Sequence, residues 1–170
     1  ILAISNAVQN DLIGRLKIRS SKIVLIPNAI DLEGFSLPVN PLALLRAPKI
    51  GIVGNFHPAK GHAVLIGATK KLCAVFPGIG VYFFGGPAKP QSVQKLVEEE
   101  NLGEVITFCG YADPVAQAIA SLDILVIPSF SEGFGLVACQ AMALKIPVVA
   151  SRVEGLCDII EHEKTGLLFE

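Results

Sequence analysis

Short apolar runs alternate with longer amphipathic segments along most of this chain. The short runs are rich in β-branched and aromatic residues, are apolar on both faces and end near Gly, Pro or Ser: 23–27, 49–54, 80–85, 105–110, 123–129 and 147–151. Such runs are typical of strands buried on both faces, as in a parallel sheet covered by helices. The longer segments are predicted helices: 60–76, 90–102, 114–121, 135–145 and 155–163.

The repeated alternation of strands and helices indicates the fold class. It predicts an α/β fold with a doubly wound, mostly parallel, Rossmann-like sheet and helices on both faces. In such sheets ligands bind beyond the carboxyl ends of the strands, at the point where the strand order reverses. Candidate functional residues are therefore expected in the segments that directly follow strands.

The first 45 residues have a different pattern. A polar helix is predicted over 5–16, with Ser5 or Asn6 as its N-cap, and a proline-containing irregular stretch covers 34–48. We interpret 1–45 as an approach segment left from a preceding domain and 46–170 as the Rossmann-like domain, truncated at its C-terminal end. Because the chain does not begin with Met, we expect it to be part of a longer protein.

The composition of the chain excludes several classes of protein. The chain has 170 residues, of which 52% are hydrophobic and 17% charged, so it is not a disordered segment. A net charge of −1 gives no support for a nucleic-acid partner. The four cysteines form no C-x-x-C pair, so we expect isolated thiols in a reducing, cytoplasmic setting. Glycines and prolines interrupt the longest uncharged run, 72–88, so no transmembrane segment is expected.

The stretch SFSEGFGLVACQ (129–140) carries the main candidate site. Its Glu132 is the only charged residue between Asp123 and Lys145. Gly133, Phe134 and Gly135 follow at the predicted start of a helix, where main-chain N–H groups have no partner within the helix. Such a helix start binds phosphate through these donors and the helix dipole.

Glu132 and Gln140 extend this candidate site in two directions. An ionised carboxylate accepts hydrogen bonds and suits the paired hydroxyls of a sugar. Eight helical residues rise about 12 Å, comparable to the span from a hexose across a pyrophosphate to a ribose. Alternatively, Glu132 caps the helix and Gln140 is an ordinary helix residue.

The loops after the other strands add weaker candidates. After the strand that ends at Gly54, the loop carries Asn55, His57 and Lys60, and Lys60 is a candidate cation for a diphosphate. The spacing fits neither a dinucleotide fingerprint nor a Walker A loop, and a solvated lysine and structural histidines are the alternative. In the loops 85–90 and 108–114, main-chain groups are candidates for contacts with a base or a sugar. The alternative is that these loops only form turns.

Four motifs in the same order resemble the C-terminal domain of the group 1 (family 4) retaining glycosyltransferases, which have the two-domain GT-B fold. They are IVLIPNAIDLEGF (23–35), IVGNFHPAKG (52–61), the segment 123–151 with its Glu132 and Gln140, and GLCDIIEHEKTGLLF (155–169). The resemblance covers almost the whole chain. It implies that 46–170 holds a nucleotide-diphosphate sugar, without metal or other cofactor.

The resemblance also implies roles for single residues. Glu132 matches the glutamate that bonds the donor sugar, and Lys60 matches the phosphate-binding lysine, so these two are the predicted catalytic residues. The predicted donor-binding set is Gly54, Asn55, Lys60, Phe108, Gly110, Glu132, Gly133, Phe134, Gly135 and Gln140. In this set the amides of Phe134 and Gly135 meet the distal phosphate, and the main chain of 108–111 lies near the base.

Two positions depart from the family pattern. Gln140 stands where a glutamate usually holds the ribose diol, and Asn55 stands where an arginine usually faces the diphosphate. Both changes weaken donor binding, since charge-assisted hydrogen bonds are lost. They leave open a divergent enzyme, a different donor, a domain with reduced activity, or a degenerate binding or interaction module. A second alternative is a GT-B-like sugar-nucleotide epimerase.

The leading hypothesis is a hexosyltransferase-type enzyme that transfers the donor sugar with retention to a sugar, lipid-linked or polysaccharide acceptor. The acceptor is expected to bind through a preceding domain, so the isolated 170 residues should bind donor without turnover. With a lipid acceptor, the enzyme would sit peripherally at the inner membrane face.

Overall fold

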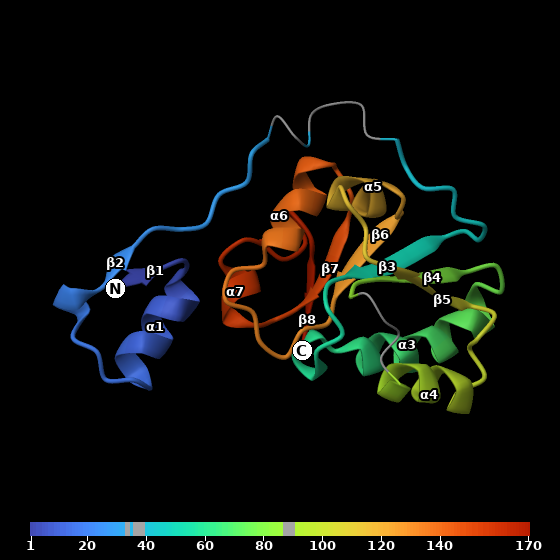
Figure 1. Cartoon of the computed structure of the whole chain (residues 1–170), viewed down its shortest axis with the longest axis horizontal. Helices are drawn as coiled ribbons and strands as arrows, with labels where there is room; N and C mark the ends of the chain where they lie inside the picture. The colour runs from blue at the N-terminus through green and yellow to red at the C-terminus, as the bar shows by residue number, and fades with distance from the viewer. Residues whose placement is uncertain (33–34, 36–39, 87–90) are drawn as a thin grey trace.

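The computed structural model describes residues 1–32, 35, 40–86 and 91–170 (Figure 1). Its centre is a parallel sheet of six strands: β3 (Lys49–Val53), β4 (Gly80–Phe84), β5 (Ile106–Gly110), β6 (Ile124–Ile127), β7 (Val148–Ser151) and β8 (Leu167–Phe169). Their order across the sheet is β5-β4-β3-β6-β7-β8, and every neighbouring pair is parallel. This order confirms the predicted doubly wound α/β fold.

The strand order reverses between β3 and β6. Counted from β3, the order is 3-2-1-4-5-6, the arrangement of dinucleotide-binding folds. β3 and β6 are directly paired, with Ile50 opposite Ile124 and Gly51 opposite Leu125. The loops that follow Val53 and Ile127 therefore leave the same edge of the sheet side by side.

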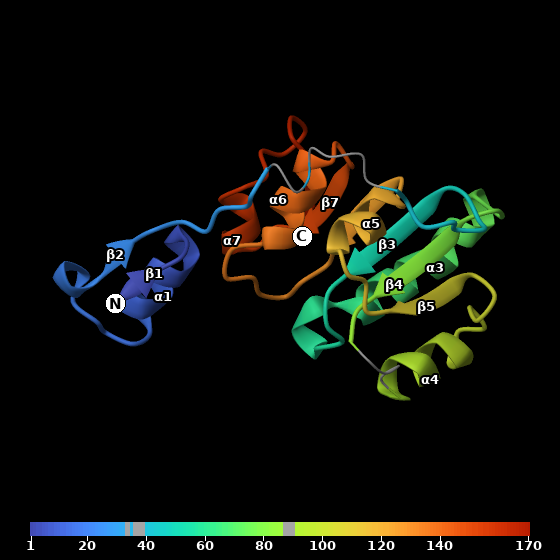
Figure 2. The ribbon, with the colours of Figure 1, turned by 45° about the horizontal axis from the view of Figure 1, so that its top comes forward.

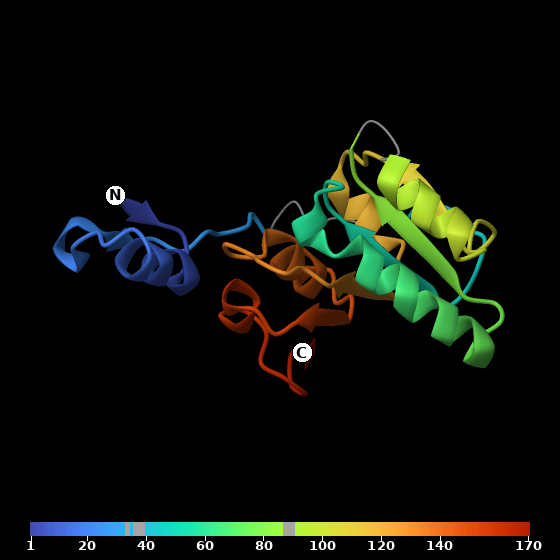
Figure 3. The ribbon, with the colours of Figure 1, turned by 90° about the horizontal axis from the view of Figure 1, so that it is seen from below.

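Helices cover both faces of the sheet (Figures 1 and 3). α3 (His62–Val75) and α4 (Gln91–Glu99) lie on one face, and α5 (Val115–Ala120) and α6 (Leu136–Ala143) lie on the other. All five residues of β4 are buried, because alternate side chains point to opposite faces and each face has a core. Val81 and Phe83 belong to the core under α3 and α4, whereas Tyr82 and Phe84 belong to the core under α5 and α6.

The N-terminal residues form a separate small unit (Figure 2). β1 (Leu2–Ala3) and β2 (Val24–Leu25) pair in parallel, and α1 (Asn6–Gly14) runs between them in sequence. The Ser5 hydroxyl caps α1 by accepting from the Val8 N–H at 3.0 Å. α1 packs beside α7 (Glu154–Cys157), and the Asn6 N–H donates to the Asp158 carboxylate at 3.2 Å.

The C-terminal end differs from the prediction. A helix was predicted over 155–163, and this prediction is wrong after Cys157, where α7 ends. The chain then continues without a helix into a turn in which the Thr165 N–H donates to the Glu161 carbonyl at 2.9 Å. Leu156 and Ile160 have helical spacing, but they reach the same core from a helix end and a turn. Strands β1 and β8 were not predicted from the sequence.

Three predicted stretches fall partly outside the described residues: the irregular segment 34–48, the start of the helix 90–102 and the loop 85–90. The remaining predicted strands and helices are present with ends shifted by a few residues. Within the described ranges, no helix combines the length and the apolar character needed to cross a membrane.

Candidate functional site

Two loops meet at the point where the strand order reverses. One runs from β3 through a short 3-10 helix (Pro58–Lys60) into α3, and the other runs from β6 into α6. Gly61 has a φ of 68°, and a Cβ atom there would lie 1.8 Å from the Pro128 carbonyl oxygen. The Phe130 N–H donates to the Ala59 carbonyl at 2.8 Å. Only glycine permits this close approach, which fixes the two loops to each other.

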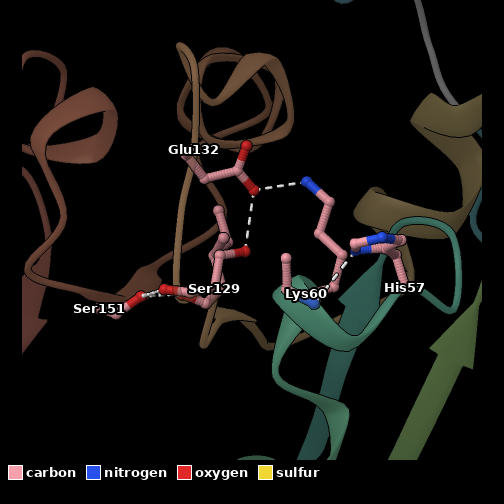
Figure 4. A network of polar contacts seen from close by, with 7 residues as sticks. His57, Lys60, Ser129, Glu132 and Ser151 are labelled. Atoms are coloured by element: carbon pink, nitrogen blue, oxygen red, sulfur yellow. Dashed lines mark hydrogen bonds and ion pairs between the residues drawn. The ribbon is translucent and has the colours of Figure 1, made fainter. Parts of the chain in front are cut away.

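Lys60 and Glu132 form an ion pair across these loops (Figure 4), with 2.5 Å between Lys60 Nζ and Glu132 Oε1. The Ser129 hydroxyl donates to the same oxygen at 2.8 Å. Ser129 is buried, and its carbonyl accepts from the Ser151 hydroxyl at 2.5 Å. The Glu132 side chain is only 13% exposed and does not turn into bulk water.

Ser129 was not singled out from the sequence. The available signal was its position two residues after the end of β6, as a small polar residue before Glu132. Its hydrogen bond holds one oxygen of Glu132, whereas within the described residues no donor reaches the other oxygen, Oε2.

The main-chain amides that precede α6 have no protein partner in the part of the chain that the structure describes. Within the described residues, no atom accepts a hydrogen bond from the N–H of Gly133, Phe134 or Gly135. Gly135 is the residue before α6 and has a φ of 96°, a conformation that strongly favours glycine. These donors and the helix dipole give the segment a local positive potential suited to an anion.

The ion pair and the free amides line one cavity of about 320 Å³. Its polar wall includes Lys60, Glu132 and the segment 133–135, and its apolar wall includes Ile52 and Val126. A cavity of this size with a few converging polar groups is typical of small-ligand sites.

A second cavity of about 210 Å³ lies beside the first. Gly54, Asn55 and Tyr111 line it, and Val53 and Val137 line both cavities. The two cavities together follow the carboxyl edge of the sheet and can accommodate an elongated ligand.

The remaining predicted residues lie around this edge. The Phe108 ring packs against Phe83 at 5.5 Å between centroids, so its side chain belongs to the core under α3 and α4. Gly110 has a φ of 75° and leads the chain into Tyr111. Gln140 is half-buried on α6, one turn beyond Leu136, and is not part of the lining of either cavity.

Two histidines lie near Lys60, and their contacts stabilise the local structure. The His62 ring is 4% exposed and lies between Phe56 and Phe83, with centroid distances of 4.8 and 5.2 Å. Burial, reinforced by the positive charge of Lys60, lowers the pKa of His62 from 6.5 to about 4. His57 is exposed, and its Nδ1 accepts from the Ala59 N–H at 3.2 Å. Of these three side chains, Lys60 is therefore the one that contacts Glu132.

Comparison of the sequence with known proteins identifies its family and several relatives. The family model for "Glycosyl transferases group 1" matches residues 47–170. The D-inositol 3-phosphate glycosyltransferase of Mycobacteroides abscessus is 33% identical over an alignment of 162 positions that covers 87% of this chain and 35% of the relative. The corresponding protein of Kineococcus radiotolerans is 32% identical over a gapped alignment of 189 positions that covers 98% of this chain and 42% of the relative.

Solved structures show the same fold. A glycosyltransferase from Rickettsia africae matches with a TM-score of 0.84 at 24% identity, over 99% of this chain and 48% of its own. Sucrose-phosphate synthase from Thermosynechococcus elongatus matches with a TM-score of 0.79 at 31% identity, over 98% and 44%. The Anabaena protein HepE, solved with UDP and glucose, matches with a TM-score of 0.82 at 22% identity, over 99% and 48%.

This chain spans less than half the length of each of these relatives. The family model covers most of its residues, including both loops that meet at Lys60 and Glu132. The chain therefore belongs to the family of group 1 glycosyl transferases.

Proposed function

We propose that this chain is the donor-binding part of a glycosyltransferase that transfers a sugar from a nucleoside diphosphate to an acceptor. The observation that carries the proposal is the set of three amides at 133–135, unpaired among the described residues, in one cavity with the Lys60–Glu132 ion pair. Each group suits a different part of a nucleotide sugar, and the strand order puts them at the edge where such ligands bind.

The diphosphate is assigned to the free amides and Lys60. As the bond between sugar and diphosphate breaks, negative charge accumulates on the departing phosphate. Fixed N–H donors and an ammonium group stabilise that charge without having to reorganise at the moment of reaction. Gly133 is exposed and carries no side chain, which leaves its main chain open to close approach.

The donor sugar is assigned to Glu132. Lys60 and Ser129 hold its Oε1, which fixes the carboxylate at the wall of the cavity. Its Oε2 has no protein donor in the described part of the chain and is available to a sugar hydroxyl. A carboxylate positioned in this way favours a polyhydroxylated ligand over a bare nucleotide.

The nucleoside is assigned to the second cavity, where Tyr111 and the main chain around Gly54 supply the walls. Asn55 lines this cavity and adds no charge, which leaves Lys60 as the cation supplied by this loop. The contact between Gln140 and the ribose stays a prediction, as does the role of Gly110.

The acceptor, the retention of configuration and the cytoplasmic location also stay predictions. Curated relatives are named D-inositol 3-phosphate glycosyltransferases, which supports an acceptor with a polyhydroxylated ring. A donor site that works without metal is expected because amides and Lys60 provide the positive potential.

Calorimetry with UDP-glucose tests the proposal, a probe chosen because HepE, which shares this fold, was also solved with UDP-glucose. The natural protein that contains this chain should bind it, and Lys60→Ala should weaken binding about 10- to 100-fold, as expected for a charge-assisted phosphate contact. Lys70→Ala is the matched control, since Lys70 is exposed and pairs with Glu100 at 2.7 Å. If GDP-, ADP- and UDP-linked sugars all fail to bind, the chain is a degenerate module.

A further inference from the structure

The Ser5 hydroxyl joins the start of α1 to the segment 133–135. It donates to the Gly133 carbonyl, and it accepts from the Val8 N–H at 3.0 Å. Ser5 is 2% exposed, so this hydroxyl is shielded from water and uses both its donor and an acceptor site within the protein. We infer that Ser5 is a positioning residue that sets the direction of the Phe134 N–H and thereby the affinity for the diphosphate. The inference rests on the proposed function.

The geometry of one peptide group transmits this contact to Phe134. The Gly133 carbonyl and the Phe134 N–H belong to the same trans peptide, and its planarity makes the two groups point in opposite directions. The carbonyl points to Ser5, so the N–H points away from the start of α1. No described atom accepts from that N–H, and Gly133 and Phe134 both line the cavity of about 320 Å³. The Ser5 contact therefore leaves the N–H available to a ligand in that cavity.

The preceding peptide group is held from α7. Gly155 lies so close to the Glu132 carbonyl that a Cβ atom at this glycine would collide with it. The N–H of that peptide belongs to Gly133, and it too lacks an acceptor in the described part of the chain. α1 and α7 pack beside each other, and the Asn6 N–H donates to the Asp158 carboxylate. Two neighbouring helices thus orient two successive peptide groups before any ligand binds.

Capping of α1 does not account for both contacts of Ser5. An N-cap serine only has to accept from an N–H in the first turn of its helix, which Ser5 does with Val8. Ser5 also donates to Gly133, whose carbonyl has no other donor among the described residues. Without the hydroxyl, this peptide group can rotate, and the Phe134 N–H loses its fixed direction. A donor that is already oriented stabilises an anion better than one that must first be ordered.

Ser5 reaches the site from the small N-terminal unit and not from the six-stranded sheet and its helices (Figure 2). The placement of that unit and the affinity for a diphosphate are therefore coupled through one hydroxyl. Such coupling is reciprocal, so a bound diphosphate should also stabilise the contact between α1 and the segment 133–135.

The test is calorimetry of the full natural protein with UDP and with UMP, which lacks the distal phosphate expected at the Phe134 amide. Ser5→Ala should weaken UDP binding about 5- to 10-fold, the order of one lost hydrogen bond, and change UMP binding less than about 2-fold. Ser5→Thr keeps a hydroxyl that can donate and accept, so its UDP affinity should stay within about 2-fold of the wild type.

Ser121→Ala is the matched control. The Ser121 hydroxyl is also buried, accepts from the Leu42 N–H at 2.7 Å and donates to the Gln117 carbonyl. Ser121 lines neither of the two cavities at the carboxyl edge of the sheet. Its replacement removes the same two kinds of hydrogen bond, so it should lower the Tm and leave the UDP affinity unchanged.

Four other outcomes would overturn the inference. If Ser5→Ala binds UDP as tightly as the wild type, or loses affinity for UDP and UMP to the same extent, Ser5 does not position the Phe134 amide. If Ser5→Thr behaves like Ser5→Ala, or if Ser121→Ala weakens UDP binding equally, the loss reflects general destabilisation. A wild-type protein that binds neither UDP nor UMP is a different result, because the proposed function then fails and this inference fails with it.

Discussion

Acidification below pH 6.5 should destabilise this domain through His62. The ring is buried between Phe56 and Phe83, and within the described residues its Nε2 has no hydrogen-bond partner. Its pKa is lowered from 6.5 to about 4 by burial and by the charge of Lys60. Between these two values the unfolded chain binds a proton that the folded chain does not, so stability falls as the pH falls.

The size of the effect follows from the two pKa values. At pH 7 the imidazole is mostly neutral in both states, and the penalty is small. At pH 5 the unfolded histidine is almost fully protonated, whereas the folded one is mostly neutral, which removes about 2 kcal/mol of unfolding free energy. For a domain of this size that corresponds to a fall in Tm of about 4–8 °C. Below pH 4 both states carry the proton, and this contribution stops growing.

Calorimetric melting between pH 7 and pH 5 measures the effect. His62→Phe keeps an aromatic ring between the two phenylalanines and removes the titrating group, so its Tm should vary less with pH than that of the wild type. His57→Ala is the control, because His57 is exposed and should leave the pH dependence of the wild type intact. Equal pH dependence in His62→Phe and wild type would refute the reasoning.

Two further predictions concern the loop after β3. Gly61→Ala should destabilise the domain by more than about 3 kcal/mol, because the new Cβ would collide with the Pro128 carbonyl and the φ of 68° is unfavourable for alanine. Gly67→Ala, on an open part of α3, should instead stabilise it by up to about 1 kcal/mol, and chemical denaturation that ranks the two variants the other way would contradict the loop contact. Asn55→Arg should tighten UDP binding about 10-fold at low salt, since it adds a cation beside the cavities, and the gain should shrink as salt is raised. An affinity for UDP that does not change would show that Asn55 lies away from the diphosphate.

Much of the fold could be predicted because its strands are buried on both faces. β4 and β7 are continuous apolar runs that end near glycine, proline or serine. Such runs are typical of interior strands, and they can be recognised without knowing which strands lie beside them. β8 was missed because it is short and only Leu168 is buried. The helix after Glu154 was predicted too long because side-chain spacing cannot distinguish a helix from a turn when both deliver Leu156 and Ile160 to one core.

The sequence was enough to locate the residues of the candidate site, but not to predict the contacts between them. The order of strands and loops was enough to identify Glu132 and Lys60 as residues that follow strands. Their ion pair joins residues far apart in the chain and depends on side-chain positions that only tertiary packing fixes. The role of Ser129 also required the structure, because its hydrogen bond to Glu132 depends on side-chain positions that the sequence does not give.

The central claim is that a diphosphate rests on the main-chain amides before α6, and amide NMR tests it most directly. Titration of the 15N-labelled chain with UDP should shift the signals of Gly133, Phe134 and Gly135 more than those of other glycines, such as Gly67 or Gly103. These larger shifts are expected in the wild type, and also in Lys60→Ala at higher UDP concentration. If UDP binds while those three amides keep their shifts, the diphosphate lies elsewhere and the account is contradicted.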